Sequence, residues 1–460
     1  MKTKMLIIAV LTLFSTSIFA QFTIDGSFRT RAQMLHGYKK SVEKETPATF
    51  GADQQTRLIL NYKTDKISTR LTIQDARVWG ADDMFNPTGT QQNSYGLGVY
   101  EAWAQVKLGE KSQLRVGRQE WKYNGSRLLS HRGWWTTGLS YDGLLYMMHN
   151  KENGLFLDLG LSYNNDKVDG KSSYDNVYLD RLKTVNFLNV KKVFNKKFNA
   201  TFNFVFSGRQ DELVESALYM KATEGIFLNY NKGKKAENGV FGTLSAYFQH
   251  GVDAVSGGGK TEVSAYMLDA HVGYRAINKK LEVLVGLEIL SGNDASNTDS
   301  TYNTVNHTFD LLYGGRHPYY GGCMDLFTLP KHMKNGGLMD PYFKAQYKLN
   351  KKGMLNLGVW MPMLANDVKS GRLEANGDPI MFEKALGQNI DLSYTHKFSK
   401  QVKFIVGASY FLASDTYKEM KKFITYDAAN AITGDDMTGQ QYFVYTTLII
   451  KPNFFSSAKK

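Results

Sequence analysis

The chain has few of the residues and segments that mark several common protein classes. It contains one cysteine, Cys323, so no internal disulfide can form, and we interpret this thiol as a packed or loop residue. Proline is scarce, at 8 of 460 residues, and no low-complexity linker divides the chain. After residue 20, no apolar stretch approaches the roughly 20 residues that a membrane helix needs. These absences exclude a disulfide-stapled module and a helical membrane protein, and they predict one domain over residues 21–460.

The first 20 residues are the one strongly apolar segment. Lys2 and Lys4 precede an apolar run from Met5 to Phe14, and the small residue Ala20 ends the segment. This arrangement is typical of a signal peptide for the general secretory route. No cysteine follows directly, so we do not expect a lipoprotein.

Apolar and polar residues then alternate in short runs. In TRLILNYK at 56–63, Leu58 and Leu60 would lie on one face of a strand, and Arg57 and Asn61 on the other. Because successive strand side chains point to opposite faces, one face can meet lipid while the other meets water. The same pattern recurs at 22–31, 97–108, 187–194, 198–206, 281–290, 354–360, 402–412 and 442–450.

The connections between these runs alternate in length. Short Lys-rich turns occur at 63–66, 108–111, 150–153, 194–197, 231–235, 277–280, 349–352 and 398–400. Longer polar, Gly-rich loops lie between them at 38–53, 79–96, 121–138, 164–178, 252–260, 293–336, 363–385 and 414–440, apart from a brief turn near 208–211. A soluble β-sandwich or propeller should not segregate loop lengths in this way. The pattern predicts an all-β, transmembrane antiparallel β-barrel of about 18 strands in the outer membrane of a Gram-negative cell, with short periplasmic turns and long external loops.

Aromatic residues near the predicted strand ends support a membrane setting. Tyr62, Tyr163, Phe194, Tyr347 and Phe398 are at positions where interfacial girdles form in such barrels. We therefore expect outer-membrane lipid and lipopolysaccharide as partners of a monomeric barrel.

The chain is basic, with a formal net charge of +13, but the placement of the charge argues against nucleic acid as a partner. Much of the excess is in the short turns, where lysines can cap the barrel rim. The strand alternation predicts that a second set of cationic side chains points into the lumen. An arginine there can pair with carboxylates or phosphates, and rings of such residues favour anions over cations. By parity this set includes Arg29, Arg31, Arg57, Lys63 and Arg70, and the four arginines are the predicted pore-lining residues. The alternative is that they brace the wall by pairing with lumen acids such as Asp25, Glu101 and Asp142.

The stretch 114–143 concentrates basic and aromatic residues. Arg115 and Arg118 have opposite parity, so a regular strand would place one of them toward lipid, at a cost on the order of 2 to 4 kcal/mol at the bilayer midplane. We therefore predict that the regular strand ends near Gly117, or that Arg118 lies above the apolar band. In either case residues 120–137 would be free to fold into the mouth of the barrel.

These residues resemble the alginate-export family of outer-membrane barrels, in a Bacteroidetes-type member. The resemblance lies in Gly117-Arg118-Gln119, Arg127, His131-Arg132, Trp134 or Trp135, and Asp142-Gly143, with a second block at 309–327, in which Arg316 and Pro318 depart from the family pattern, and a weaker one at 74–80. The family implies passage of an anionic polyuronate through a pore lined by arginine and lysine. By this resemblance the pore constriction would contain Arg118, Arg127, Arg132 and Asp142, and the pore lining would contain Arg29, Arg31, Arg57, Arg70 and Arg115.

Other constellations point only weakly to chemistry. Ser130-His131 could suggest a hydrolase, but adjacent strand residues face opposite ways and no nucleophile-elbow pattern is present. The histidines show no paired metal-ligand spacing. The oxygen-rich loop with Asn293, Asp294, Asn297 and Asp299 is better interpreted as solvated than as a calcium site. We therefore predict no enzyme activity and no cofactor.

The sequence thus predicts a passive, porin-like channel for anionic or polar solutes, which include anionic polysaccharides such as alginate. The alternative function is an outer-membrane binding or adhesion protein that uses the barrel as an anchor, which the long 293–336 loop keeps open.

Overall fold

The computed structural model describes residues 20–38, 40–80, 96–164, 182–211, 213–214, 216–233, 236–321, 330–437 and 441–457. The predicted signal peptide, apart from Ala20, lies outside the described residues, as does Cys323. No helix among the described residues is long and apolar enough to cross a membrane.

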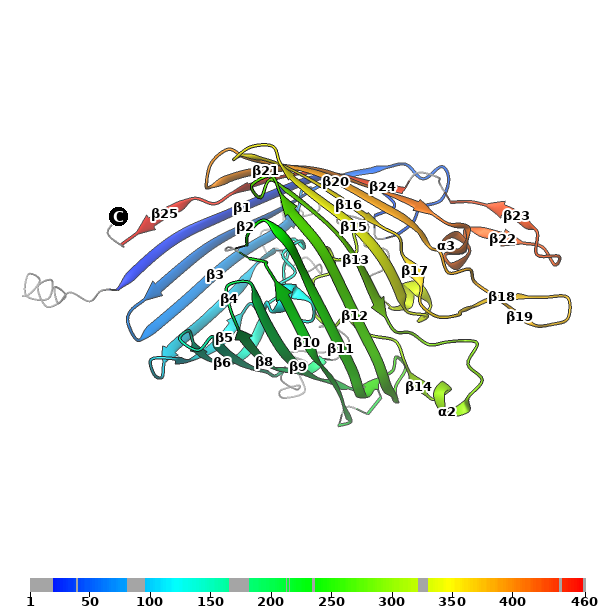
Figure 1. The fold of residues 1–460 in the computed structure, drawn as a ribbon, viewed down its shortest axis with the longest axis horizontal. Coiled ribbons are helices and arrows are strands. Elements are labelled where there is room, and N and C mark those ends of the chain that lie inside the picture. The colour runs from blue at the N-terminus through cyan, green and yellow to red at the C-terminus, as the bar shows by residue number, and fades with distance from the viewer. Residues whose placement is uncertain are drawn as a thin grey trace, which may run out of the picture.

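Eighteen strands form a closed antiparallel β-barrel, as predicted (Figure 1). In chain order they are β1 (Gln21–His36), β2 (Thr49–Lys63), β3 (Ile67–Val78), β4 (Gly96–Lys107), β5 (Ser112–Gln119), β6 (Tyr141–Asn150), β7 (Leu155–Ser162), β8 (Leu182–Val193), β9 (Phe198–Gln210), β10 (Leu218–Tyr230), β11 (Gly239–Ala254), β12 (Lys260–Ala276), β13 (Leu281–Leu290), β15 (Leu338–Lys348), β16 (Gly353–Trp360), β20 (Gly387–Lys397), β21 (Val402–Ala413) and β24 (Gln441–Ile450).

The barrel closes between its first and last long strands. Each of the eighteen strands pairs antiparallel with the next, and β24 pairs with β1 from Phe28–Ile450 to His36–Tyr442. The short strand β25 (Asn453–Ser456) continues this seam along the beginning of β1. The backbone groups of these strands are therefore hydrogen-bonded around the whole barrel, as a membrane interior requires.

The two faces of the wall have the opposite polarity to those of a soluble protein. Gln55 in β2 and Gln74 in β3 face the lumen and are only 6% and 9% exposed, whereas Leu58 and Leu71 face outward and are 39% and 36% exposed. Apolar residues form the outer surface, because this surface is expected to contact lipid. The alternation recognised in the sequence therefore positions polar side chains inside the barrel.

Connection lengths follow the predicted alternation with one correction. The turns after β2, β4, β6, β8, β12, β15 and β20 are short, and the connections after β5, β13, β16 and β21 are long. Residues 252–260 were expected to form a long loop, which is wrong because β11 continues to Ala254 and β12 begins at Lys260. The direct β11–β12 pairing extends to the Ala254–Lys260 pair and leaves only a tight Gly-rich turn.

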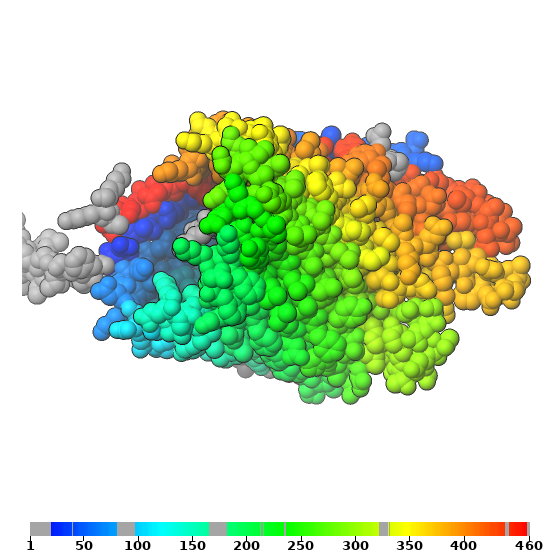
Figure 2. All heavy atoms as spheres, viewed as in Figure 1, coloured from blue at the N-terminus to red at the C-terminus, as the bar shows by residue number. Residues whose placement is uncertain are grey.

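The long connections behave in two ways. Some project beyond the strand ends and include the hairpins β18 (Lys369–Leu373)–β19 (Pro379–Met381) and β22 (Ile424–Tyr426)–β23 (Ile432–Asp435), together with α3 (Asp415–Met420), at the right of Figures 1 and 2. Besides these elements, the long connections contain η1 (Asn124–Ser126), α2 (Ser300–Asn303), β14 (Val305–Asn306), η2 (Pro330–Met333) and β17 (Met363–Leu364). Two segments, 120–140 and 309–321, supply buried residues to one large core cluster together with lumen-facing wall residues. The lumen is therefore narrowed by folded chain.

Candidate pore constriction

The segment 120–140 is packed inside the barrel between β5 and β6. Trp121 is fully buried, and its ring stacks on Tyr141 at a centroid distance of 4.5 Å. Asn124, Ser126 and Arg132 all have positive φ, at 47°, 70° and 45°. Non-glycine residues adopt this conformation at a cost of about 1 to 3 kcal/mol, and such strain clusters at functional sites. The segment bends sharply at these positions and is held by surrounding contacts.

A row of wall side chains ties this segment to β1, β2 and β3. Arg29 donates to the carbonyl oxygens of Gly133 and Trp135, and Arg31 donates to that of Trp134 at 2.7 Å. Gln55 and Gln74 donate to the next two carbonyl oxygens, those of Thr136 and Thr137. Five consecutive carbonyl groups, 133–137, are thus bound by side chains of the wall. These backbone groups have no sheet partner in the lumen, so the side chains satisfy them.

The segment 309–321 meets the first one inside the lumen. Leu129 and Tyr313 form an isolated bridge, and the Gly315 amide donates to the Ser126 carbonyl oxygen at 2.7 Å. A Cβ atom at Gly314 would lie 2.2 Å from the Arg127 carbonyl oxygen, so only glycine permits this approach. The two segments form one packed unit.

Arg127 fixes this unit to the opposite wall. Its side chain is 1% exposed, and its guanidinium lies 2.8 Å from Glu288 of β13 and 3.6 Å from Asp269 of β12. The same group lies over the Tyr319 ring at 3.8 Å from the centroid, and Tyr320 donates to Glu288. Arg127 therefore lies in the lumen, as expected, but its charge is matched by two carboxylates.

A cavity of about 380 Å³ lies between the two segments and the wall of β1, β21 and β24. No Asp or Glu lines it among the described residues. Its lining includes the cationic side chains of Arg29, Arg31, Lys122, Arg132 and Arg316, together with two histidines and the aromatic rings of Tyr38, Trp134 and Trp135. We call this space the cationic cavity.

Several polar atoms of the cationic cavity lack partners. The Nε–H groups of Arg29, Arg31 and Arg132 are buried and have no hydrogen-bond partner among the described residues, and the same holds for the Thr447 hydroxyl. Burial, followed by the charge of Arg316, lowers the pKa of Arg132. Buried donors that lack partners are rare in proteins and indicate a missing ligand or solvent. The cavity is thus suited to an anion.

His317 separates the cationic cavity from a second one. Its ring stacks on Trp134 at 3.7 Å, and burial lowers its pKa to about 3, with further effects of Arg31 and Lys344. The neighbouring Pro318 carbonyl oxygen accepts a hydrogen bond from Lys344 at 2.8 Å. His317 is therefore neutral at physiological pH.

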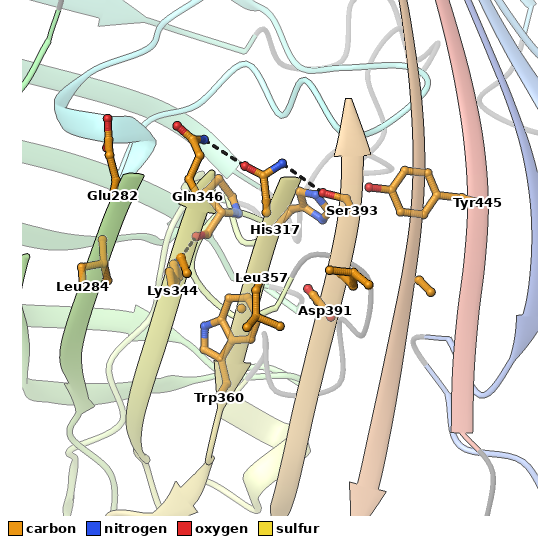
Figure 3. A pocket seen from close by; sticks show the side chains of 16 residues that line it. Glu282, Leu284, His317, Lys344, Gln346, Leu357, Trp360, Asp391, Ser393 and Tyr445 are labelled. Atoms are coloured by element: carbon orange, nitrogen blue, oxygen red, sulfur yellow. Dashed lines mark hydrogen bonds between the residues drawn. The ribbon is translucent and has the colours of Figure 1, made fainter. Parts of the chain in front are cut away.

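The second cavity, of about 520 Å³, has a different lining (Figure 3). Gln346 donates to Asn356, which donates to Ser393, and these bonds form a neutral polar track across three strands. Glu282 and Asp391 also line this space, with Lys344. Its charges are mixed, in contrast to those of the cationic cavity.

Arg118 and Asp142 were expected in the constriction, and this placement is wrong. Both side chains are on the outer face of the barrel, exposed by 43% and 53%, and form a two-pronged ion pair at 2.6 and 2.9 Å. Gly117 has a φ of +117°, but the pairing register continues through it to Gln119, so it does not flip the following side chains. The alternation therefore places Arg118 with the outward-facing Val116. The strand does end near Gly117, as the sequence predicted, because β5 finishes two residues later at Gln119.

The remaining predicted pore-lining arginines face inward and have wall partners. Arg57 bonds Gln74 at 2.8 Å and lies 3.8 Å from Glu120, and Arg70 bonds Asn61 at 2.8 Å and lies 3.3 Å from Glu101. Arg115 bonds Gln105 and lies over the Trp103 ring at 4.0 Å. Arg31 is 3.9 Å from Asp53. Bracing, the alternative considered for these residues, accounts for much of their contact.

Sequence reasoning missed Lys122 and Arg316 as lining of the cationic cavity. Arg316 stood out only as a departure from the family pattern, and Lys122 lay within the basic stretch without a signal of its own. Their placement depends on the approach of two segments almost 200 residues apart in the chain. In the 293–299 loop, which the sequence predicts to be solvated, Asp294 accepts a hydrogen bond from Ser296 and Asp299 caps α2. No group of three metal-ligating side chains occurs in the described part of the chain.

Comparison with known proteins shows the fold. No family model matches the sequence, and no curated protein matches it. The chain is similar in structure to Pseudomonas aeruginosa OpdL, with 12% identity, a TM-score of 0.58 and coverage of 94% of this chain and 99% of that one. Acinetobacter baumannii OccAB1 gives 12% identity, a TM-score of 0.57 and coverage of 95% and 97%, and a variant of OccD1 (OprD) gives 9%, 0.55, 94% and 96%. The fold is thus that of the outer-membrane porins of this group.

Proposed function

We propose that the protein is a passive outer-membrane channel whose constriction favours anionic and polar solutes. The observation that carries this proposal is the cationic cavity, where five cationic side chains meet between the two inward segments and no carboxylate lines the space. The porin-like barrel supports a channel. We expect it to be a monomer in contact with outer-membrane lipid and lipopolysaccharide.

The electrostatics of the cavity support anion preference. A guanidinium is always charged and can pair with a carboxylate or phosphate through two parallel bonds. Arg29 and Arg132 line the cavity and make no ion pair with a described residue, unlike Arg31, which lies 3.9 Å from Asp53. Fixed positive charge in a narrow, poorly solvated space attracts anions and repels cations.

The geometry supports a rigid constriction. The five bound carbonyl groups of 133–137 hold one side of the cavity, and the Arg132 guanidinium bonds the Leu312 carbonyl oxygen at 3.4 Å on the other. Leu312 itself has a φ of +50°. Strained residues that are fixed from both sides are preorganised for a ligand.

The solute class includes small anions and anionic polysaccharides such as alginate. The resemblance of the 114–143 and 309–327 segments to the alginate-export family supports the polyuronate, and Arg132, one of the residues that this resemblance singles out, lines the cavity. The aromatic rings beside the arginines would support a sugar ring. Catalysis and cofactors are not part of the proposal.

An adhesion or binding protein is the second candidate. The external hairpins favour it, because Arg372 and Glu419 bind each other at 2.8 Å and join the 369–381 hairpin to α3 in one projecting unit. In this function the barrel would be an anchor and would conduct little.

Reversal potentials in planar bilayers separate the two functions. Under a tenfold gradient of potassium chloride, the current should reverse at a potential shifted from zero toward the equilibrium potential of chloride. We expect chloride to be more permeable than potassium by about fivefold. Absence of conductance, or cation preference, would contradict the proposed channel. The same recording with glucuronate in place of chloride tests whether a uronate is carried.

A further inference from the structure

The positive charges at the periplasmic end of the barrel differ in whether they have acidic partners. Two turn lysines and one arginine near the end of β12 have acidic partners. Lys111 lies 2.6 Å from Glu152, Lys197 lies 2.8 Å from Glu237, and Arg275 lies 2.9 Å from Glu282. Each pair offsets one positive charge, although exposed pairs contribute little to stability.

The sector formed by β16, β20, β21 and β24 is different. A recess of about 560 Å³ lies at the periplasmic ends of these strands, and no Asp or Glu lines it among the described residues. None of its lysines makes an ion pair with a described residue. The recess is lined by six lysines, Lys351, Lys352, Lys397, Lys400, Lys403 and Lys451, and we call it the lysine recess.

The strand register holds these charges together. Lys397 of β20 is directly opposite Lys403 of β21, and Lys403 is opposite Ile449 of β24. The Lys451 amide donates to the Gln401 carbonyl oxygen at 2.9 Å, and the Lys397 amide donates to that of Lys352 at 2.8 Å. Like charges directly opposite each other destabilise a sheet. The arrangement is unfavourable unless an anion neutralises it.

The lysine recess and the cationic cavity are two distinct spaces along the same wall. Ile449 lines both the lysine recess and the cationic cavity, so the recess follows the cavity along the same wall toward the periplasm. Lys397 and Lys403 have the same parity as the lumen-facing Asn389 and Ser409 of their strands. Lys397 and Lys403 therefore face the inner side of the periplasmic mouth, whereas Lys351, Lys352 and Lys400 lie in the turns at its rim.

We propose that the lysine recess is a binding site for a multivalent, phosphate-bearing anion. Ammonium groups on flexible stems bind phosphate as point charges and can approach it from several directions. The phosphate can belong to a free oligophosphate in the periplasm or to the headgroup of an anionic lipid of the inner leaflet. Phe398, exposed by 58% at the rim of the recess, would meet lipid in the second case. The site does not depend on the anion preference of the constriction.

Calorimetric titration of the full chain with inorganic tripolyphosphate, in neutral detergent at low salt, tests this proposal. We expect one binding site, and we expect the double substitution Lys397→Gln/Lys403→Gln to weaken its affinity by about tenfold, since two of the six charges are lost. The control Lys111→Gln/Lys197→Gln removes the same charge from ion-paired turns and should stay within about twofold of the original protein. Equal affinities of the two variants, or no binding by the original protein, would overturn the site.

Two further measurements test the site independently of the calorimetric comparison. Tripolyphosphate should raise the unfolding temperature of the original protein but not that of Lys397→Gln/Lys403→Gln, because a ligand stabilises only the state that binds it. If the double variant does not fold, Lys403→Gln alone should lower the affinity by about threefold, and an unchanged affinity would overturn the proposal.

Nanodiscs then distinguish the two sources of phosphate. If a lipid headgroup occupies the recess, phosphatidylglycerol discs should lower the tripolyphosphate affinity of the original protein relative to phosphatidylcholine discs, and the double variant should show no such difference. If the anion is free, the two kinds of disc should give equal affinities for the original protein. Both results retain the phosphate site, and an identical lipid effect on the variant and the original protein would contradict its lipid-bound form.

Discussion

Arg127 and Arg132 are five positions apart in one inward segment, and both are nearly buried, at 1% and 8% exposure. Arg127 lies between the carboxylates of Glu288 and Asp269, whereas Arg132 makes no ion pair with a described residue. The first arginine braces the constriction, and the second presents its charge to the cationic cavity. Burial and charge alone therefore do not identify a solute-binding arginine. The presence or absence of a carboxylate partner distinguishes an arginine that braces the wall from one that can bind a solute.

The largest expected effect follows the loss of Arg127. Arg127→Gln leaves Glu288 and Asp269 buried without their cation, which costs about 3 to 5 kcal/mol when one partner of a buried pair is removed. Unfolding in urea, followed by tryptophan fluorescence, measures this free energy. A loss below about 1 kcal/mol would be typical of an exposed pair and would remove the distinction between the two arginines.

A smaller effect is expected where the segment is tied to the wall. Gln55→Leu/Gln74→Leu removes the donors for the Thr136 and Thr137 carbonyl oxygens, and two such bonds contribute about 1 to 3 kcal/mol together. The matched control Gln54→Leu is on the outer face, where Gln54 bonds only Thr56 and Trp79. The open-channel current in single-channel recordings should fluctuate more in the double variant than in the original protein, and the Gln54→Leu control should show no such increase. Equal noise in both variants would show that the constriction does not need these bonds.

The smallest effect concerns acid stability. Because the pKa of His317 falls from the ordinary 6.5 to about 3 in the folded chain, the unfolded chain binds the proton first as pH falls. Stability from this group is fully present above pH 6.5 and is lost as pH falls toward 3. His317→Gln should therefore flatten the fall in unfolding free energy between these pH values. An unchanged slope would place the pH dependence on other groups.

The barrel was predictable because its signal is local. The dyad repeat and the alternation of Lys-rich turns with long loops depend on neighbouring residues, and both the antiparallel barrel and its inside-out polarity are confirmed. Parity also placed Arg29, Arg31, Arg57 and Arg70 in the lumen.

The site was predictable only in part because its contacts are distant. Arg118 and Asp142 were misplaced because they were carried over from the family resemblance, whereas the strand register puts both side chains on the outer face. The roles of Arg127 and Arg132 depend on residues of β12, β13 and the 309–321 segment, which sequence spacing does not connect. Folding of two loops into one lumen has no periodic signal.

The central claim is that Arg132, and not every buried arginine, gives the channel its anion preference. The most direct test is the ratio of chloride to potassium permeability, from reversal potentials, in Arg132→Gln and in the control Arg118→Gln, which removes an equal charge from the outer face. We predict that the ratio falls by about threefold or more in Arg132→Gln, since a poorly screened lumen charge is lost, and stays unchanged in Arg118→Gln. An unchanged ratio in Arg132→Gln, or an equal fall in both variants, would contradict the account.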